Sequence, residues 1–203
     1  ISSKFLDLIA RINNNRIRKK YSEAYSFCVE AEKKAPREPI TWEYTTIIEF
    51  FYEMTLPKDK RKEIKEILKS VWDNLKICEA NNVKKNQIEE IKVEIANYLF
   101  NLSKSKIGSY YAKSKREKGY WSKKGRHYTI QYLKLFEDCY RLTKDIYYLR
   151  GYVDELSKPY KWIISNSSGE LSNLSSCGKK FNAIAQRERV INKILKIDSD
   201  YVV

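Results

Sequence analysis

Basic and aromatic residues gather in one segment of the chain, between Lys104 and Arg126. Nine Lys and Arg residues lie there against one acidic residue, Glu117, so the segment carries a net +8 of the chain's net charge of +14. Ammonium and guanidinium groups neutralise phosphates and release counterions, and aromatic rings stack on exposed bases. The segment therefore predicts contact with a nucleic acid. The candidate residues for this contact are Lys113, Lys115, Arg116, Lys118, Tyr120, Trp121, Lys123, Lys124, Arg126 and His127.

We expect this segment, taken as residues 104–128, to form a charged helical hairpin. Its glycines permit bends, and the Lys-Lys-Gly-Arg sequence at 123–126 is expected to form the turn. The alternative is a solvated helix face whose aromatic side chains point into the core, since a run of charge is usually such a face. Binding to a membrane surface is disfavoured, because no continuous Leu/Phe face accompanies the lysines.

The residue types that catalysis requires are sparse. His127 is the single histidine, which excludes a histidine-based metal cluster, and no acid near it in sequence could orient it as a general base. Within each of the acidic pairs Glu89–Glu90 and Glu137–Asp138, the two side chains point to different helix faces, which is poor geometry for a shared catalytic site. No glycine precedes Gly108, so the first half holds no phosphate-binding loop. We expect no enzyme activity, no metal and no cofactor.

Composition places the chain among helical globular proteins with acidic partners. It has 203 residues, 42% of them hydrophobic, which supports a core. The net charge favours a nucleic acid, an anionic membrane or an acidic protein as partner, although it could also reflect a codon bias. The four cysteines are too far apart for a zinc site or a redox dithiol, and buried free thiols are typical of a reducing compartment. No signal peptide or membrane-spanning run is visible, so we expect a cytoplasmic (intracellular) protein.

The elements that must position these residues are helices. Prolines occur only at 36, 39, 57 and 159, and few breakers favour long helices. Apolar residues recur at three- and four-residue steps, which predicts an all-α fold of about eight helices in antiparallel hairpins. These stripes are Leu6–Ile12, Tyr21–Ala31, Trp42–Phe51, Ile64–Cys78, Ile88–Leu102, Ile130–Thr143, Ile146–Leu156 and Phe181–Leu195. An Asn81–Asn82 turn is expected between the fourth and fifth.

The first helices carry a repeat-like spacing. Tyr21, Ala24, Cys28, Ala31 and Pro36 follow one another as Tyr-x2-Ala-x3-Cys-x2-Ala-x4-Pro, and Trp42 lies 34 residues after Leu8. Over about residues 5–54 this resembles a tetratricopeptide repeat (TPR). The resemblance implies a stacked helical scaffold with a groove that holds a peptide or protein partner. The candidate groove residues are Asn15, Thr45, Glu49 and Tyr52, whose alternative role is ordinary helix surface.

From these features we expect a non-catalytic helical-repeat module for protein–protein interaction, belonging to a larger intracellular protein. One alternative is an RNA- or DNA-binding module acting through residues 104–128. Another is the sensor end of a larger nucleotide-hydrolysing regulatory protein, with further domains outside this sequence. The expected organisation is TPR-like hairpins over 1–57, a long-helix region over 58–164, a loop over 165–178 and a C-terminal helix over 179–203, all in one continuous helical domain.

Overall fold

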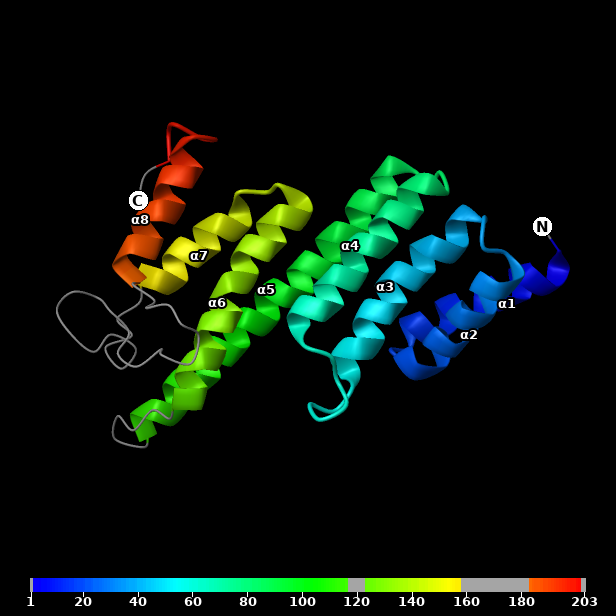
Figure 1. Ribbon diagram of the computed structural model, residues 1–203, viewed down its shortest axis with the longest axis horizontal. Helices are drawn as coiled ribbons and strands as arrows, with labels where there is room; N and C mark the ends of the chain where they lie inside the picture. Colours follow the sequence, from blue (N-terminus) through cyan, green and yellow to red (C-terminus); the bar gives the residue numbers. More distant parts are fainter. Residues whose placement is uncertain (1, 117–122, 158–182, 202–203) are drawn as a thin grey trace. The chain divides into compact units, whose positions relative to one another are not determined.

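The chain folds into helices, which confirms the all-α prediction. The computed structural model describes residues 2–116, 123–157 and 183–201, except for the side chains of 111–128 and 183–184. These ranges contain eight helices and no strand (Figure 1). The helices are α1 (Ser3–Ile17), α2 (Tyr21–Lys34), α3 (Pro39–Thr55), α4 (Ile64–Ala80), α5 (Lys85–Arg116), α6 (Lys123–Thr143), α7 (Tyr147–Ser157) and α8 (Ala183–Leu195).

Local chemistry sets where the first helices begin and end. The Ser2 hydroxyl accepts a hydrogen bond from the Phe5 N–H at 3.2 Å and so caps α1. Proline stands at the first position of α3, where its missing N–H costs nothing. Lys19 and Asn82, just after α1 and α4, adopt left-handed backbone with φ of 57° and 60°. The conformation of Asn82 confirms the turn expected at Asn81–Asn82.

The first compact unit, Ile1–Ile95, stacks successive helices against one another. Contacts join α1 to α2, α2 to α3 and α3 to α4, and α1 also touches α3. The small residues of α2 are fully buried: Ala24, Cys28 and Ala31 are each 0% exposed. Small side chains let helix backbones approach closely, so α2 can pack against a neighbour on each side. Trp42 of α3 donates from Nε1 to the Pro36 carbonyl at 2.7 Å and so holds the turn between α2 and α3.

The apolar stripe of α1 differs in detail from the predicted one. The sequence pattern places Leu6, Ile9 and Ile12 on the core side, whereas the helix buries Phe5, Leu8, Ile9 and Ile12 and leaves Leu6 56% exposed. The helix that these residues predict is confirmed, but Leu6 lies on the rim of its buried face, because α1 packs through the neighbouring positions of the same helix. Periodicity defines a face only to within about one residue's rotation.

The second compact unit, Ala96–Val203, is built around aromatic rings. Phe100 of α5 meets Phe136 of α6 edge to face at 5.3 Å and Tyr148 of α7 at 5.5 Å. Phe136 in turn stacks on Tyr152 of α7, with ring centroids 5.6 Å apart. Gly151 lies against this cluster, because a side chain there would meet the Phe100 ring. Contacts also join α6 to α7 and α7 to α8.

The helical hairpin expected around the basic segment differs from the observed backbone. Gly108 lies inside α5, so it does not bend the chain out of the helix, and residues 123–126 begin α6 instead of forming the turn. The connection at 117–122, with Gly119, and the expected loop at 165–178 lie outside the described residues. The division of the chain into two compact units falls between Ile95 and Ala96, inside the α5 sequence, and the expected regional boundaries near 57 and 164 stay predictions. No helix in the described ranges is long and apolar enough to cross a membrane.

Candidate partner-binding face

Three of the predicted groove residues share one side of α3. Thr45, Glu49 and Tyr52 are spaced by four and three residues, which places them on one helix face. Thr45 is 3% exposed, and its hydroxyl donates to Glu32 Oε1 of α2 at 3.0 Å. The side chain of Thr45 therefore orients a carboxylate on the neighbouring helix and is itself covered.

Carboxylates from two helices surround this side of α3. Glu32 comes from α2, whereas Glu49 and Glu53 come from successive turns of α3. Glu49 Oε2 accepts a hydrogen bond from Asn74 Nδ2 of α4 at 2.7 Å, which ties α3 to α4. Glu53 Oε1 forms an ion pair with Lys62 Nζ at 2.9 Å, and Lys62 belongs to the segment between α3 and α4.

Two tyrosine rings lie beside the carboxylates. Tyr25 of α2 and Tyr52 of α3 are stacked, with centroids 4.5 Å apart and an angle of 7° between their planes. Burial raises the pKa of Tyr25, and the charges of Glu49 and Glu32 raise it further. The ring stacking, the hydrogen bond from Thr45 to Glu32 and the shared face of α3 place the rings and the carboxylates in one cluster. We call the cluster the acidic–aromatic face, made of Tyr25, Glu32, Glu49, Tyr52, Glu53 and Lys62.

The charges of the acidic–aromatic face do not balance. Three carboxylates face one ammonium group. Burial raises the pKa of Glu32, the nearby Glu49 adds to that rise, and the hydrogen bond from Thr45 opposes it. The two Glu53 oxygens differ, because Oε1 pairs with Lys62 while Oε2 is buried and has no hydrogen-bond donor in the described part of the chain. The face therefore has a surplus of hydrogen-bond acceptors and suits a cationic ligand.

Asn15, the fourth predicted groove residue, has its described contact within its own helix. Its side-chain amide donates to the Arg11 carbonyl at 2.9 Å. The next residue, Arg16, pairs with Glu94 of α5, so this end of α1 is directed toward α5. The contacts of the described residues do not bring Asn15 to the acidic–aromatic face, and its role in binding stays a prediction.

The structure places the basic candidates only through their backbone. Lys113, Lys115 and Arg116 end α5, and Lys123, Lys124, Arg126 and His127 begin α6. Their side chains, and the whole of Lys118, Tyr120 and Trp121, lie outside the described residues. At the described edge of this segment, the Tyr110 ring lies 6.5 Å from that of buried Tyr132. Tyr110 thus lies beside a core residue, as expected for an aromatic side chain turned toward the interior.

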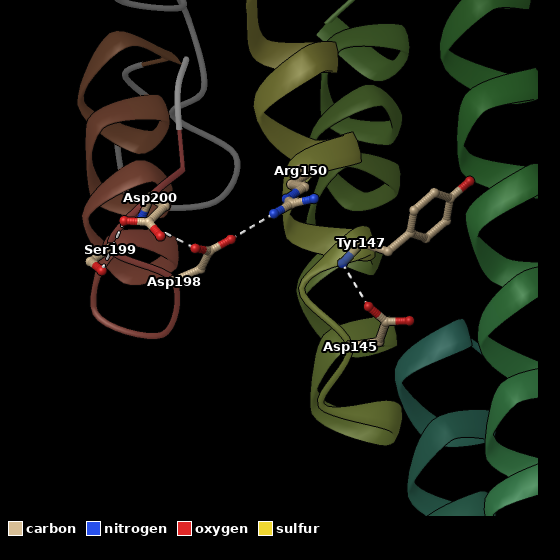
Figure 2. Close-up of polar contacts among 6 residues, drawn as sticks. All are labelled: Asp145, Tyr147, Arg150, Asp198, Ser199 and Asp200. Atoms are coloured by element: carbon tan, nitrogen blue, oxygen red, sulfur yellow. Dashed lines mark hydrogen bonds and ion pairs between the residues drawn. The ribbon is translucent and has the colours of Figure 1, made fainter.

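A second polar cluster, in Ala96–Val203, has a structural role. Figure 2 shows Arg150 of α7 pairing with Asp198, after α8, at 2.7 Å, and Asp145 Oδ1 accepting from the Tyr147 N–H at 2.8 Å. The Arg150 guanidinium also lies 5.3 Å from the Tyr201 ring centroid. These contacts cap α7 and fasten the turn after α8 to it. Among the described residues, no group of three His, Cys, Asp or Glu side chains could hold a metal ion.

Sequence reasoning missed Tyr25, Glu32, Glu53 and Lys62. The one available signal was the four-residue spacing of Glu49 and Glu53 on α3. The pairing of Glu32 with Thr45, 13 residues apart, depends on how α2 crosses α3 and leaves no local pattern. Comparisons of the chain with protein families, with curated proteins and with solved structures gave no match.

Proposed function

We propose that this chain is a non-catalytic, TPR-like helical module that binds a protein partner through the acidic–aromatic face. The observation that carries the proposal is the surplus of carboxylates beside the half-buried rings of Tyr25 and Tyr52, in a unit of stacked helices. Tyrosine is enriched at protein interfaces because it offers apolar area with a polar tip. The TPR-like spacing of α2 and α3 supports the same class of function. The module is proposed to act within a larger intracellular protein.

Selection from a displayed random-peptide library against the immobilised chain tests this proposal. Selected peptides are expected to bind the wild type and to lose at least about tenfold in affinity against Glu49→Ala and Tyr52→Ala. Lys76→Ser is the control, because Lys76 lies in the same unit and pairs with Asp73 in an exposed i,i+3 contact on α4. A library that yields no binder, or binders indifferent to both variants, would contradict the proposal.

A second candidate function, nucleic-acid binding, is supported by the distribution of charge. Residues 96–203 hold 21 Lys and Arg against 10 Asp and Glu, whereas residues 1–95 hold 19 against 16. Fluorescence anisotropy with labelled RNA and DNA at about 50 and 200 mM salt tests it, because six or more phosphate contacts cost on the order of a thousandfold over that range. Replacement of Lys115, Arg116, Lys123, Lys124 and Arg126 by Ser is expected to abolish such binding. Affinity that does not change with salt would exclude the backbone contacts on which this function depends.

A further inference from the structure

Glu53 has a buried carboxylate in which only one of the two oxygens has a partner. The residue is 8% exposed, so its charge is largely removed from water. Lys62 Nζ contacts Oε1, while Oε2 has no donor within the described part of the chain. A buried acceptor without a donor is destabilising, and more so when it is charged. A ligand that donates to Oε2 would recover this loss.

Lys62 contacts Glu53 through one oxygen and is itself half-exposed. It lies in the segment between α3 and α4, and its side chain is 49% exposed. An ammonium group is a compact, strongly hydrated charge on a flexible stem, and here it contacts one of the two oxygens. The Lys62 side chain can therefore turn out into solvent, which would leave Oε1 as well as Oε2 of Glu53 without a donor.

We infer that the acidic–aromatic face binds an arginine side chain of the partner, which displaces Lys62 from Glu53. A planar guanidinium group can donate to both oxygens of one carboxylate in parallel, which a single ammonium group cannot do with the same geometry. Glu32 and Glu49 add negative charge around the site, and Tyr25 and Tyr52 offer aromatic surface that favours a guanidinium. This inference rests on the proposed protein-binding function and specifies the residue that is recognised.

The chemistry separates arginine from its close analogues. Lysine carries the same charge but would only repeat the contact that Lys62 already makes. Citrulline has nearly the shape of arginine but carries no charge, so it gains little from the carboxylates. An arginine peptide should therefore bind at least about tenfold more tightly than matched lysine or citrulline peptides. Removal of Lys62 should strengthen binding, because the internal competitor is gone.

The test is a titration of the isotope-labelled chain with three short Gly/Ser peptides that carry a central arginine, lysine or citrulline. Nuclear magnetic resonance follows the Asn74 side-chain amide and the Tyr52 backbone amide, which report directly on this face. The proteins are the wild type, Glu53→Gln, Lys62→Ser and the control Lys76→Ser, which removes the same charge from the same unit. We expect Lys62→Ser to tighten arginine binding at least about threefold relative to Lys76→Ser, and Glu53→Gln to weaken it at least about tenfold.

Several binding results would overturn the inference. Equal affinity for arginine and lysine peptides would show a general acidic surface, and no shift up to about 5 mM arginine peptide would show no arginine site. Weaker binding to Lys62→Ser would make Lys62 part of the binding surface instead of its cover. If Glu53→Gln does not fold, the comparison of Lys62→Ser with Lys76→Ser decides alone. Library-selected peptides that bind this face without arginine would leave the proposed function standing and refute this inference.

Discussion

Gly151 provides the sharpest test of the packing described here. A Cβ at this position would lie 2.5 Å from Phe100 Cε2 and 2.9 Å from Cζ, which is closer than carbon atoms approach. The Phe100 ring cannot move freely, because Phe136, Tyr147 and Tyr148 surround it with centroids 5.2 to 5.5 Å away. Overpacking a core costs about 1–3 kcal/mol. Replacing a helical glycine by alanine returns about 0.5–1 kcal/mol of that.

Gly151→Ala is therefore expected to lower the free energy of unfolding by about 1–2 kcal/mol, which corresponds to a fall in Tm of several degrees. Gly108→Ala is the matched control. Gly108 is also helical and lies in the same unit, and a Cβ there would meet no atom within 4 Å apart from its chain neighbours and the backbone of its own helix. It should gain about 0.5–1 kcal/mol from reduced backbone entropy. Urea unfolding monitored by circular dichroism measures both.

The two alanine variants are expected to change the free energy of unfolding in opposite directions. A Gly151→Ala variant as stable as the wild type would refute the close approach of α7 to Phe100. A second variant, Gly151→Ala with Phe100→Leu, should be less destabilised than the sum of its single changes, because the smaller side chain relieves the clash. Strict additivity would show that the cost of Gly151→Ala arises elsewhere.

Three further predictions follow from described contacts. Burial raises the pKa of the Cys28 thiol to about 12 and also raises that of Cys139. In a variant with Cys177 replaced by Ser, an aromatic disulfide reagent at about pH 8 should therefore label Cys28, Cys78 and Cys139 only as fast as the protein unfolds. Rapid labelling of the native state would contradict the burial of these thiols. Burial raises the pKa of Glu32 above its usual 4.5, whereas Lys34 lowers that of Glu30. The folded state thus binds the Glu32 proton more tightly than the unfolded state does, so Glu32 causes a loss of stability as pH rises above 4.5, and Glu30 causes one as pH falls below it. Urea midpoints between about pH 3 and 7 should show the first trend reduced in Glu32→Gln and the second reduced in Glu30→Gln, and unchanged slopes would refute these assignments. A double-mutant cycle with Tyr25→Leu and Tyr52→Leu should give a coupling of about 0.5–1.5 kcal/mol for the stacked pair, whereas zero coupling would mean that the rings do not interact.

Local patterns in the sequence predicted much of the fold. Six of the predicted apolar stripes lie within helices, and the seventh does so from Tyr147 onward. The eighth coincides with α8 from Ala183 onward, and its predicted start at Phe181 lies outside the described residues. A period near 3.6 is a property of one segment and needs no partner. The burial of Ala24, Cys28 and Ala31 was also foreseeable, because small residues in a repeated register mark a close helix–helix contact. Periodicity alone does not decide the exposure of Leu6, whose position on the rim of its stripe depends on how α1 is rotated against its neighbours.

The candidate site was predicted only in part. Thr45, Glu49 and Tyr52 were expected from their place on α3, but their surroundings were not. The Glu32 and Asn74 contacts join residues 13 and 25 positions apart, and the ion pair of Glu53 with Lys62 depends on the path of the segment after α3. No spacing rule links such pairs, because helix crossing and rotation bring them together.

The sequence by itself determined that this protein is helical, where most helices lie, and that most of its net positive charge lies beyond residue 95. Each of these follows from composition or from a repeat within one segment. Only the tertiary structure decided that the carboxylate of Glu53 is buried with one oxygen unmatched, and that Gly151 must lack a side chain beside Phe100. These features arise where residues from different segments pack together. The free energy of such packing depends on distances between atoms, and the order of residues alone does not specify those distances.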